Sequence, residues 1–453
     1  MPNLKGIFSR GRDAWPRGLE IGLLVALASA PLLVGCSTSD LLSVQVPNSV
    51  NAKLFDDPAN AGLMVTSVIG DFECAFGGFV VTEALLSDEL HDASYSNGNW
   101  NVDRRDDDFT SGTYGTASCT SQTGLYTPLS TAREEADAAI RRLNGWTDAQ
   151  VPARTSLIAQ ANLYAGFSYA ALGMSMCQAA FDLGPLVDQK GMFALAEARF
   201  SAAITAAQSS GQNNVLNAAY VGRARMRLFQ HNAQAAISDA QQVPPGFVFN
   251  ASRDQTDSRR FNQIFQSILT AGTATVEVSS RALMTENGQI DPRSATIMLK
   301  TPPSDGLATI YIPTKYEAAS LTAGESIPIP IASYAEAQLI LAEAEGGSSA
   351  VSIINNMRAA VGLQPYTGAT DTQSITNLIA SERQRVLFFD GFRAFDIERF
   401  NLTLIPPIGS PYLQGGVYGA TVCFPVPDIE RYNNPQIVVS ELVSGVQGQT
   451  PIP

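Results

Sequence analysis

The chain has 453 residues, a formal net charge of −13 and a hydrophobic content of 45%. These values describe a folded, weakly charged protein. Its length is sufficient for one large domain or for two to three domains of ordinary size. The acidic balance argues against nucleic acid and anionic membrane surfaces as partners, because both need basic patches. It fits a neutral ligand, a cation or a basic protein. His91 and His231 lie far apart, outside any metal-ligand spacing, so no metal or cofactor is expected.

The N-terminus has the pattern of an exported lipoprotein. Basic residues come first, and an apolar run over residues 21–34 follows them. This run is shorter than the ~20 residues that a membrane span needs, and Pro31 interrupts it, so we predict a signal peptide over residues 1–35. Leu33-Val34-Gly35-Cys36 resembles a lipobox, which predicts a lipid on Cys36. Ser37 after it favours the outer membrane, by resemblance to Gram-negative lipoproteins.

The mature chain is predicted to begin with a tether. Without residues 1–35 it has 25 basic and 40 acidic residues, a net charge of −15. Residues 36–55 read as an extended, lipidated tether, and residues 56–453 as a single folded domain. Asp57-Pro58 is a favourable helix start, so a first helix is expected from there to Ile69.

Helical spacing of apolar residues predicts a series of paired helices in the middle of the chain. They are expected at residues 126–146, 155–172, 193–208, 215–230 and 233–243. Alanines at the expected contacts let helices approach closely, as in tetratricopeptide hairpins, and about four such units are expected. The basic residues that close one helix are expected on its solvated side: Arg223, Arg225, Arg227 and His231.

The segment from Ser87 to Ser111 is polar and rich in turn residues. An aromatic face beside amide groups suits sugar recognition, because rings stack on C–H faces while amides bind hydroxyls. The alternative is that Trp100 packs this loop onto the rest of the domain. The candidate ligand-binding residues here are Tyr95, Asn99, Trp100 and Asn101.

Residues 244–330 are punctuated by Pro and Gly, with short β-like runs near 275–279, 308–312 and 327–331. Three helices are then expected between Pro328 and Phe400. The second stops at Gly362, and Thr370-Asp371-Thr372 can cap the third.

A dense block of charges and aromatics spans residues 382–399. Paired carboxylates and arginines raise the question of a hydrolase. Charges packed among phenylalanines are more often ion pairs that hold helices in register, and we expect that role here. No nucleophile elbow, phosphate loop or histidine dyad is present in the sequence, so we expect no catalysis.

The ordered motifs "AEAQLILAEAE", "NNMRAAVGL" and "ERQRVLFFDGFRAFDIERF" resemble the C-terminal signature of the SusD/RagB family. "CFPVPDIERYNNPQ" at residues 423–436 resembles that family's terminal motif. Two features depart from the family: Ser333-Tyr334 replaces a frequent arginine, and the chain is short, which puts the ligand in question more than the fold.

The resemblance implies a mainly α fold, with a tetratricopeptide-like helical-repeat scaffold and a loop-rich, small-β second subdomain. Residues ~126–243 and ~331–400 would form the helical-repeat parts, and residues ~70–125 and ~244–330 the ligand-binding parts. The second part would supply Tyr311 and Tyr316 as ligand-binding residues.

The resemblance also implies a lipid-anchored outer-membrane protein, facing the cell surface, that binds an oligosaccharide or another oligomeric nutrient and passes it to a SusC-like TonB-dependent transporter. The alternative is a tetratricopeptide-type assembly lipoprotein without a small ligand. The two differ in whether the candidate aromatics converge on one exposed concavity.

Apart from Cys36, four cysteines remain, and they allow three pairings. We favour a Cys74–Cys119 disulfide, since both residues lie in the loop-rich N-terminal portion. Cys177 lies in an apolar helix and is expected to be a buried free thiol.

Overall fold

The computed structural model describes residues 52–106, 112–282, 285–286, 288–316 and 324–446. The predicted signal peptide, the lipobox cysteine Cys36 and most of the tether lie outside these residues. From Ala52 onward the chain forms one compact unit, which is mainly helical. The predicted fold class is thereby confirmed, including the small sheets.

Helix α2 (Ala61–Leu86) is the centre of the core. It follows the short η1 (Ala52–Asp56) and η2 (Pro58–Asn60), and the side chain of Asp57 caps η2. Its apolar run extends the helix to Leu86, well beyond the expected end at Ile69. By length and composition this helix could cross a membrane, yet 72% of its most apolar window is buried inside the domain. It contacts α5, α6, α10 and α15 and is therefore a core helix.

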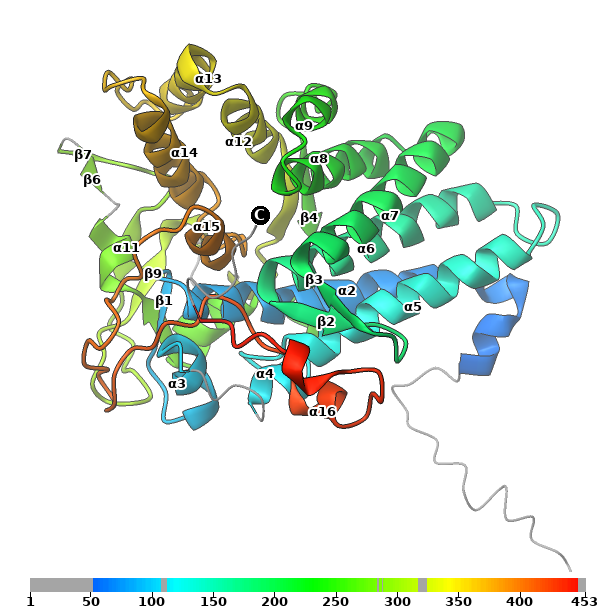
Figure 1. Ribbon diagram of the computed structural model, residues 1–453, viewed down its shortest axis with the longest axis horizontal. Coiled ribbons are helices and arrows are strands. Elements are labelled where there is room, and N and C mark those ends of the chain that lie inside the picture. The colour runs from blue at the N-terminus through cyan, green and yellow to red at the C-terminus, as the bar shows by residue number, and fades with distance from the viewer. Residues whose placement is uncertain (1–51, 107–111, 283–284, 287, 317–323, 447–453) are drawn as a thin grey trace, which may run out of the picture. The chain divides into compact units, whose positions relative to one another are not determined.

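Five helices form the first scaffold: α5 (Tyr126–Gly145), α6 (Arg154–Ser175), α7 (Gln189–Ser210), α8 (Asn213–Phe229) and α9 (Ala233–Ala240). Each packs against the next, and α5 to α8 lie side by side in Figure 1. Glycines permit the close approach: a Cβ on Gly166 or Gly222 would meet the Phe200 ring at 2.7 or 2.5 Å. The sequence-predicted helices agree with these to within a few residues.

The second helical group contains α12 (Tyr334–Glu345), α13 (Gly347–Ala360), α14 (Thr372–Val386) and α15 (Arg393–Arg399). Ser333 caps α12, and the Asp371 carboxylate caps α14, accepting from Ser374 N. Gly362 has φ +78°, the left-handed conformation expected after α13. Helix α12 contacts α8 and α9, so the two groups share one core.

Short elements build the rest of the domain. The helices are α3 (Asn97–Asp103), α4 (Thr113–Thr116), α10 (Gln263–Phe265), α11 (Val278–Ala282) and α16 (Asp428–Arg431). The strand pairs, all antiparallel, are β1 (Leu90–Asp92) with β5 (Ala274–Val276), β2 (Gln178–Ala180) with β3 (Leu186–Asp188), β4 (Val248–Ala251) with β10 (Ile329–Ser333), β6 (Thr285–Glu286) with β7 (Gln289–Ile290), and β8 (Thr296–Met298) with β9 (Tyr311–Pro313).

The charged block of residues 382–399 forms ion pairs, as predicted. The Glu382 carboxylate accepts from Arg358 at 2.6 Å and from Arg293 at 2.7 Å. Arg383 donates to Asp396 at 2.8 Å. Because Glu382, Arg358, Arg383 and Asp396 are almost completely buried, their pairs hold α13, α14 and α15 in register.

The expectation that Arg225 is solvated is wrong. Arg225 is 5% exposed, and its guanidinium donates to both carboxylate oxygens of Glu336, at 2.6 and 2.8 Å. This pair joins α8 to α12. The prediction failed because the carboxylate that pairs with Arg225 comes from a segment 111 residues away, which the local helical pattern does not indicate.

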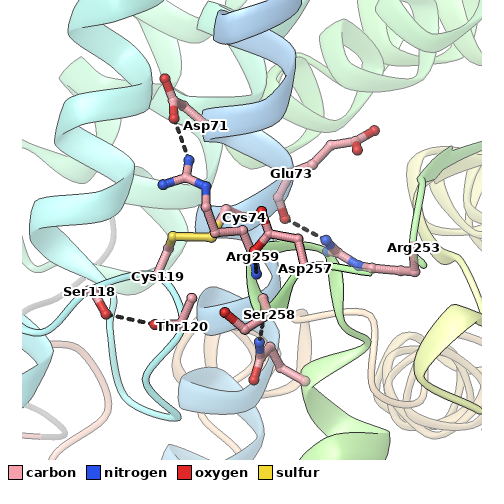
Figure 2. The surroundings of a disulfide bond; sticks show 11 residues. Asp71, Glu73, Cys74, Ser118, Cys119, Thr120, Arg253, Asp257, Ser258 and Arg259 are labelled. Atoms are coloured by element: carbon pink, nitrogen blue, oxygen red, sulfur yellow. Dashed lines mark hydrogen bonds and ion pairs between the residues drawn. A yellow bond between two sulfur atoms is a disulfide. The ribbon is translucent and has the colours of Figure 1, made fainter. Parts of the chain in front are cut away.

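Two disulfides cross-link the domain. Cys74 of α2 is bonded to Cys119, the pair favoured from the sequence, and Figure 2 shows the ion pair of Asp71 with Arg259 beside it. Cys177 is not a free thiol: it is bonded to Cys423, 246 residues away. This bond links the end of α6 to the C-terminal motif. The apolar sequence around Cys177 predicted burial but gave no information about a distant cysteine partner.

Replacing Glu382 with Gln should destabilise the protein strongly. The substitution removes the buried carboxylate that Arg358 and Arg293 share, while Arg293 keeps its pair with Asp291, and breaking such a buried pair should cost about 3–5 kcal/mol. Urea unfolding measures the loss. Glu345→Gln, at an exposed position of the α12 end, should change stability by less than about 0.5 kcal/mol. Equal stabilities of the two variants would contradict a structural role for the pair.

Candidate functional site

The candidate site is an open cleft of about 640 Å³ between the loop-rich segments. Strands β1, β5 and β9 form one side, and the loop after α15 forms the other. It is lined by His91, Thr275, Val276, Glu277, Val278, Leu307, Ala308, Thr309, Tyr311, Pro406, Pro411, Tyr412, Leu413 and Tyr418. Four rings, a carboxylate and exposed aliphatic groups therefore meet in one concavity.

Thr275 joins the strands that carry the cleft. It lies opposite His91 in the β1–β5 register. Its hydroxyl donates to the carbonyl of Thr309 at 2.8 Å and accepts from the backbone N–H of Tyr311 at 2.8 Å. One buried hydroxyl thus fixes β9, which carries the lining residue Tyr311, against β5.

The Asp103 carboxylate organises the floor of the cleft. Its Oδ2 accepts from Asp92 N at 2.7 Å and from the Tyr412 hydroxyl at 2.9 Å, and it lies 3.0 Å from His91 Nδ1. Asp103 is 2% exposed. A single carboxylate from α3 therefore connects strand β1 with the loop that contains Tyr412.

The charges of the floor are strongly coupled. Burial lowers the pKa of His91, but the carboxylates of Asp103 and Glu277 outweigh it and raise that pKa to about 9. Burial and the neighbouring Asp103 raise the pKa of Asp92 to about 7. At neutral pH His91 is therefore an imidazolium between carboxylates.

Arg105 supports the floor from behind. It is completely buried, with φ +55°, and donates to the carbonyls of Ile405 at 3.0 Å and Gly419 at 3.3 Å. Its guanidinium lies 4.8 Å from the centre of the Tyr418 ring. Burial lowers the pKa of this arginine. These contacts fix the C-terminal loop on the segment that follows α3.

Of the residues predicted from the sequence, Tyr311 lies in the lining, whereas the side chain of Tyr316 lies outside the described part of the structure. Tyr95 is 71% exposed, and its hydroxyl donates to the carbonyl of Asp305 at 2.7 Å. That carbonyl is two residues from Leu307 of the lining. Tyr95 thus lies next to the cleft, outside its lining.

The polar residues around Trp100 have internal partners. Asn99 is 7% exposed, and its amide donates to Asp92 at 3.2 Å and to Gln122 at 2.6 Å. Trp100 is half-buried and donates to the Ser94 carbonyl at 2.9 Å, while Asn101 accepts from Arg104 at 2.8 Å. Asn99 therefore supports the floor, and a ligand contact by Trp100 or Asn101 stays a prediction.

Sequence reasoning missed His91, Glu277, Tyr412 and Tyr418. His91 was considered only for metal binding and set aside because of its spacing from His231, and Glu277 is one acid in a β-like run. The two tyrosines flank Gly415-Gly416, which indicated no more than a loop. The one sequence signal for a site here was the presence of Tyr412 and Tyr418 around the glycine pair of a loop. Nothing in the local sequence connects these tyrosines with His91.

The chemistry of the lining indicates which ligands the cleft could bind. Within the described residues, no group of three or more His, Cys, Asp or Glu side chains could hold a metal ion. The partly exposed ring of Tyr311 and the exposed aliphatic groups of the lining offer surfaces for C–H faces, and the edges of the more buried Tyr412, Tyr418 and His91 rings lie beneath them. This combination is typical of sites for polyhydroxylated ligands.

The comparisons with known proteins agree with the fold. Residues 252–421 match the model of the SusD family. Three similar solved structures are a SusD superfamily protein from Bacteroides vulgatus (17% identity, TM-score 0.64, 85% of this chain and 99% of that chain), a laminarin-binding SusD-like protein (16%, 0.55, 84% and 98%) and surface glycan-binding protein A from Bacteroides uniformis (14%, 0.60, 84% and 98%). No curated protein sequence matches.

The chain therefore has the SusD fold, and the resemblance to the SusD/RagB family is confirmed. At these identities the solved structures establish the fold alone.

Replacing Asp103 with Asn should lower the pKa of His91 from about 9 toward its ordinary value of 6.5. Because the folded-state pKa is raised, protonated His91 stabilises the fold fully below pH 6.5, and this contribution is lost as pH rises through about 9. The variant should therefore lose less stability between these pH values.

An NMR titration of the histidine ring signals measures the pKa directly. The chain has two histidines, so a His231→Gln background assigns the signal. An unchanged pKa in the Asp103→Asn variant would show that this carboxylate does not hold the proton.

Proposed function

We propose that this protein is a carbohydrate-binding protein of the cell envelope, and that the cleft is its ligand site. The observation that carries this proposal is one open concavity of about 640 Å³ that Tyr311, Tyr412, Tyr418 and His91 line, with Tyr311 the most exposed of the four rings. Such a volume accommodates a few sugar units. The names of two structural relatives, one laminarin-binding and one glycan-binding, support the same ligand class.

In this proposal the helical-repeat parts, residues ~126–243 and ~331–400, are the scaffold. The segments of residues ~70–125 and ~244–330, joined by the loop after α15, supply the site. The first of these segments includes much of α2, so its loop-rich portion begins after Leu86. The protein binds its ligand without chemical conversion.

We further propose that Cys36 carries a lipid that holds the protein on the outer membrane, at the cell surface, and that the bound glycan passes to a SusC-like TonB-dependent transporter. The lipobox pattern and the family resemblance support this. The cleft is open, as a site that loads a long polymer and releases it to a second protein requires.

The alternative, an assembly protein without a small ligand, has one observation in its favour. A second concavity of about 490 Å³ lies at α12 and α13, with apolar groups from Tyr334, Met357, Val361 and Val386. It does not continue along the first helical scaffold, where α5 to α9 pack on one another. A groove along the repeats would be expected of an assembly protein, so ligand binding is the better-supported function.

Tyr311→Ala should weaken binding to whichever glycan the wild type retards in affinity electrophoresis. Loss of a central aromatic contact should cost about 1–3 kcal/mol, and Trp100→Ala tests the second predicted contact at the same magnitude. Tyr432→Ala, at a 77% exposed tyrosine outside the cleft, is the matched control and should bind normally. Wild-type affinity in a folded Tyr311→Ala variant would show that the cleft is not the ligand site.

Cys36→Ala should move the protein from the membrane fraction to the soluble fraction, because the predicted acyl anchor can no longer be attached. Fractionation of cells and incorporation of labelled fatty acid measure this. Cys177 and Cys423 lie in a disulfide and offer no alternative acylation site. Undiminished labelling of the variant would exclude Cys36 as the lipidated residue.

A further inference from the structure

The described lining of the cleft contains no lysine or arginine that could neutralise an anionic ligand. Among its fourteen lining residues, all within the described part of the chain, there is no lysine or arginine. His91 is the one cationic group, and it already lies 3.0 Å from Asp103 and 3.9 Å from Glu277. A carboxylate or sulfate that approached His91 would therefore meet two carboxylates that compete for the same charge.

Two arginines near the cleft whose side chains the structure describes, Arg104 and Arg105, are engaged elsewhere. Arg105 is completely buried and bonded to backbone carbonyls, so a ligand does not reach its guanidinium. Arg104 donates to Asn101 at 2.8 Å and to Asp106 at 3.1 Å. Lys300 is exposed beyond the end of β8 and is not part of the lining.

The walls of the cleft also favour an uncharged ligand over an anionic one. Val278, Leu307 and Leu413 are 63%, 59% and 52% exposed, and they form its apolar rim. An anionic group that packed against this rim would lose water without gaining an ion pair. The C–H face of an uncharged sugar loses little there and gains apolar contact.

We propose that the cleft selects uncharged glycans and rejects polymers that carry carboxylate or sulfate groups. Two observations carry this inference: the described lining has no lysine or arginine, and His91 already lies close to the carboxylates of Asp103 and Glu277. The inference rests on the proposed carbohydrate-binding function. The ligand class is thereby narrowed to neutral polysaccharides and their oligosaccharides.

The test compares neutral polysaccharides with their own anionic derivatives. Hydroxyethyl cellulose is paired with carboxymethyl cellulose, and dextran and laminarin are each paired with their sulfated forms. Affinity electrophoresis and calorimetry are performed at ~0.15 M salt, where the Debye length of about 8 Å screens the charge of the whole protein. For a backbone that binds, the anionic derivative should bind at least about tenfold more weakly.

A charge-adding variant locates the cause. Leu307→Arg places a cation on the rim and should improve the relative affinity for the anionic derivative by about threefold. Leu195→Arg adds the same charge at a 39% exposed leucine of α7, away from the cleft, and should leave the ratio unchanged. Leu413→Lys replaces Leu307→Arg if that variant does not fold.

The outcomes separate the two proposals. Equal binding of neutral and anionic partners overturns the selectivity and leaves carbohydrate binding standing. An equal shift in Leu195→Arg assigns the discrimination to the net charge of the protein and overturns the role of the cleft. Retardation by none of the polysaccharides overturns the carbohydrate-binding function itself, and the selectivity with it.

Discussion

The bidentate pair of Arg393 with Asp88 connects the helical scaffold to the cleft. Arg393 donates to both carboxylate oxygens of Asp88, at 2.6 and 2.7 Å, and both side chains are buried. Asp88 stands between the end of α2 and strand β1, and its carbonyl accepts from the Ser280 hydroxyl at 2.5 Å. The position of β1, and with it His91, therefore depends on a guanidinium from the far end of the chain. Burying such a pair is costly unless all its partners are present, so the C-terminal segment must fold together with the N-terminal one.

Near the Arg393–Asp88 pair, the end of α2 and the segment that follows it contain buried carboxyl groups whose raised pKa favours the neutral form. Burial and the nearby Glu398 and Glu89 raise the pKa of Glu83 well above its ordinary value, and burial raises the pKa of Glu89 to about 8. Acids whose folded-state pKa is raised stabilise the fold most below their unfolded pKa and lose this contribution as pH rises through the folded value. The raised pKa of His91 acts in the same direction, whereas the lowered pKa of the buried Asp396 acts in the opposite direction.

The helical scaffold and the cleft are built from different kinds of structure. Helices packed through small residues and buried ion pairs form the scaffold, while the cleft is built from short strands and loops packed on it. Asp103, Thr275 and Arg105 connect these loops through hydrogen bonds to backbone atoms as well as side chains. Such bonds hold a binding surface in place without requiring regular secondary structure at the site.

Local sequence was sufficient to predict most of the long helices and several of their caps, and the family resemblance indicated the class of fold. Gly362 and Asp371 mark helix ends through local backbone conformation and local hydrogen bonds, which nearby residues fully specify. The ordered motifs of residues 328–400 identified the family resemblance for the same reason. It also indicated Tyr311 as a site residue, through that resemblance.

Tertiary structure alone decided which distant residues meet. Cys177 pairs with Cys423 and Arg225 with Glu336, because packing brings together segments whose separation in sequence carries no geometric information. His91, Glu277, Tyr412 and Tyr418 form one floor for that reason too. A buried charge is recognisable only when its partner is known, and a cleft is a relation between segments, so neither can be read from local sequence.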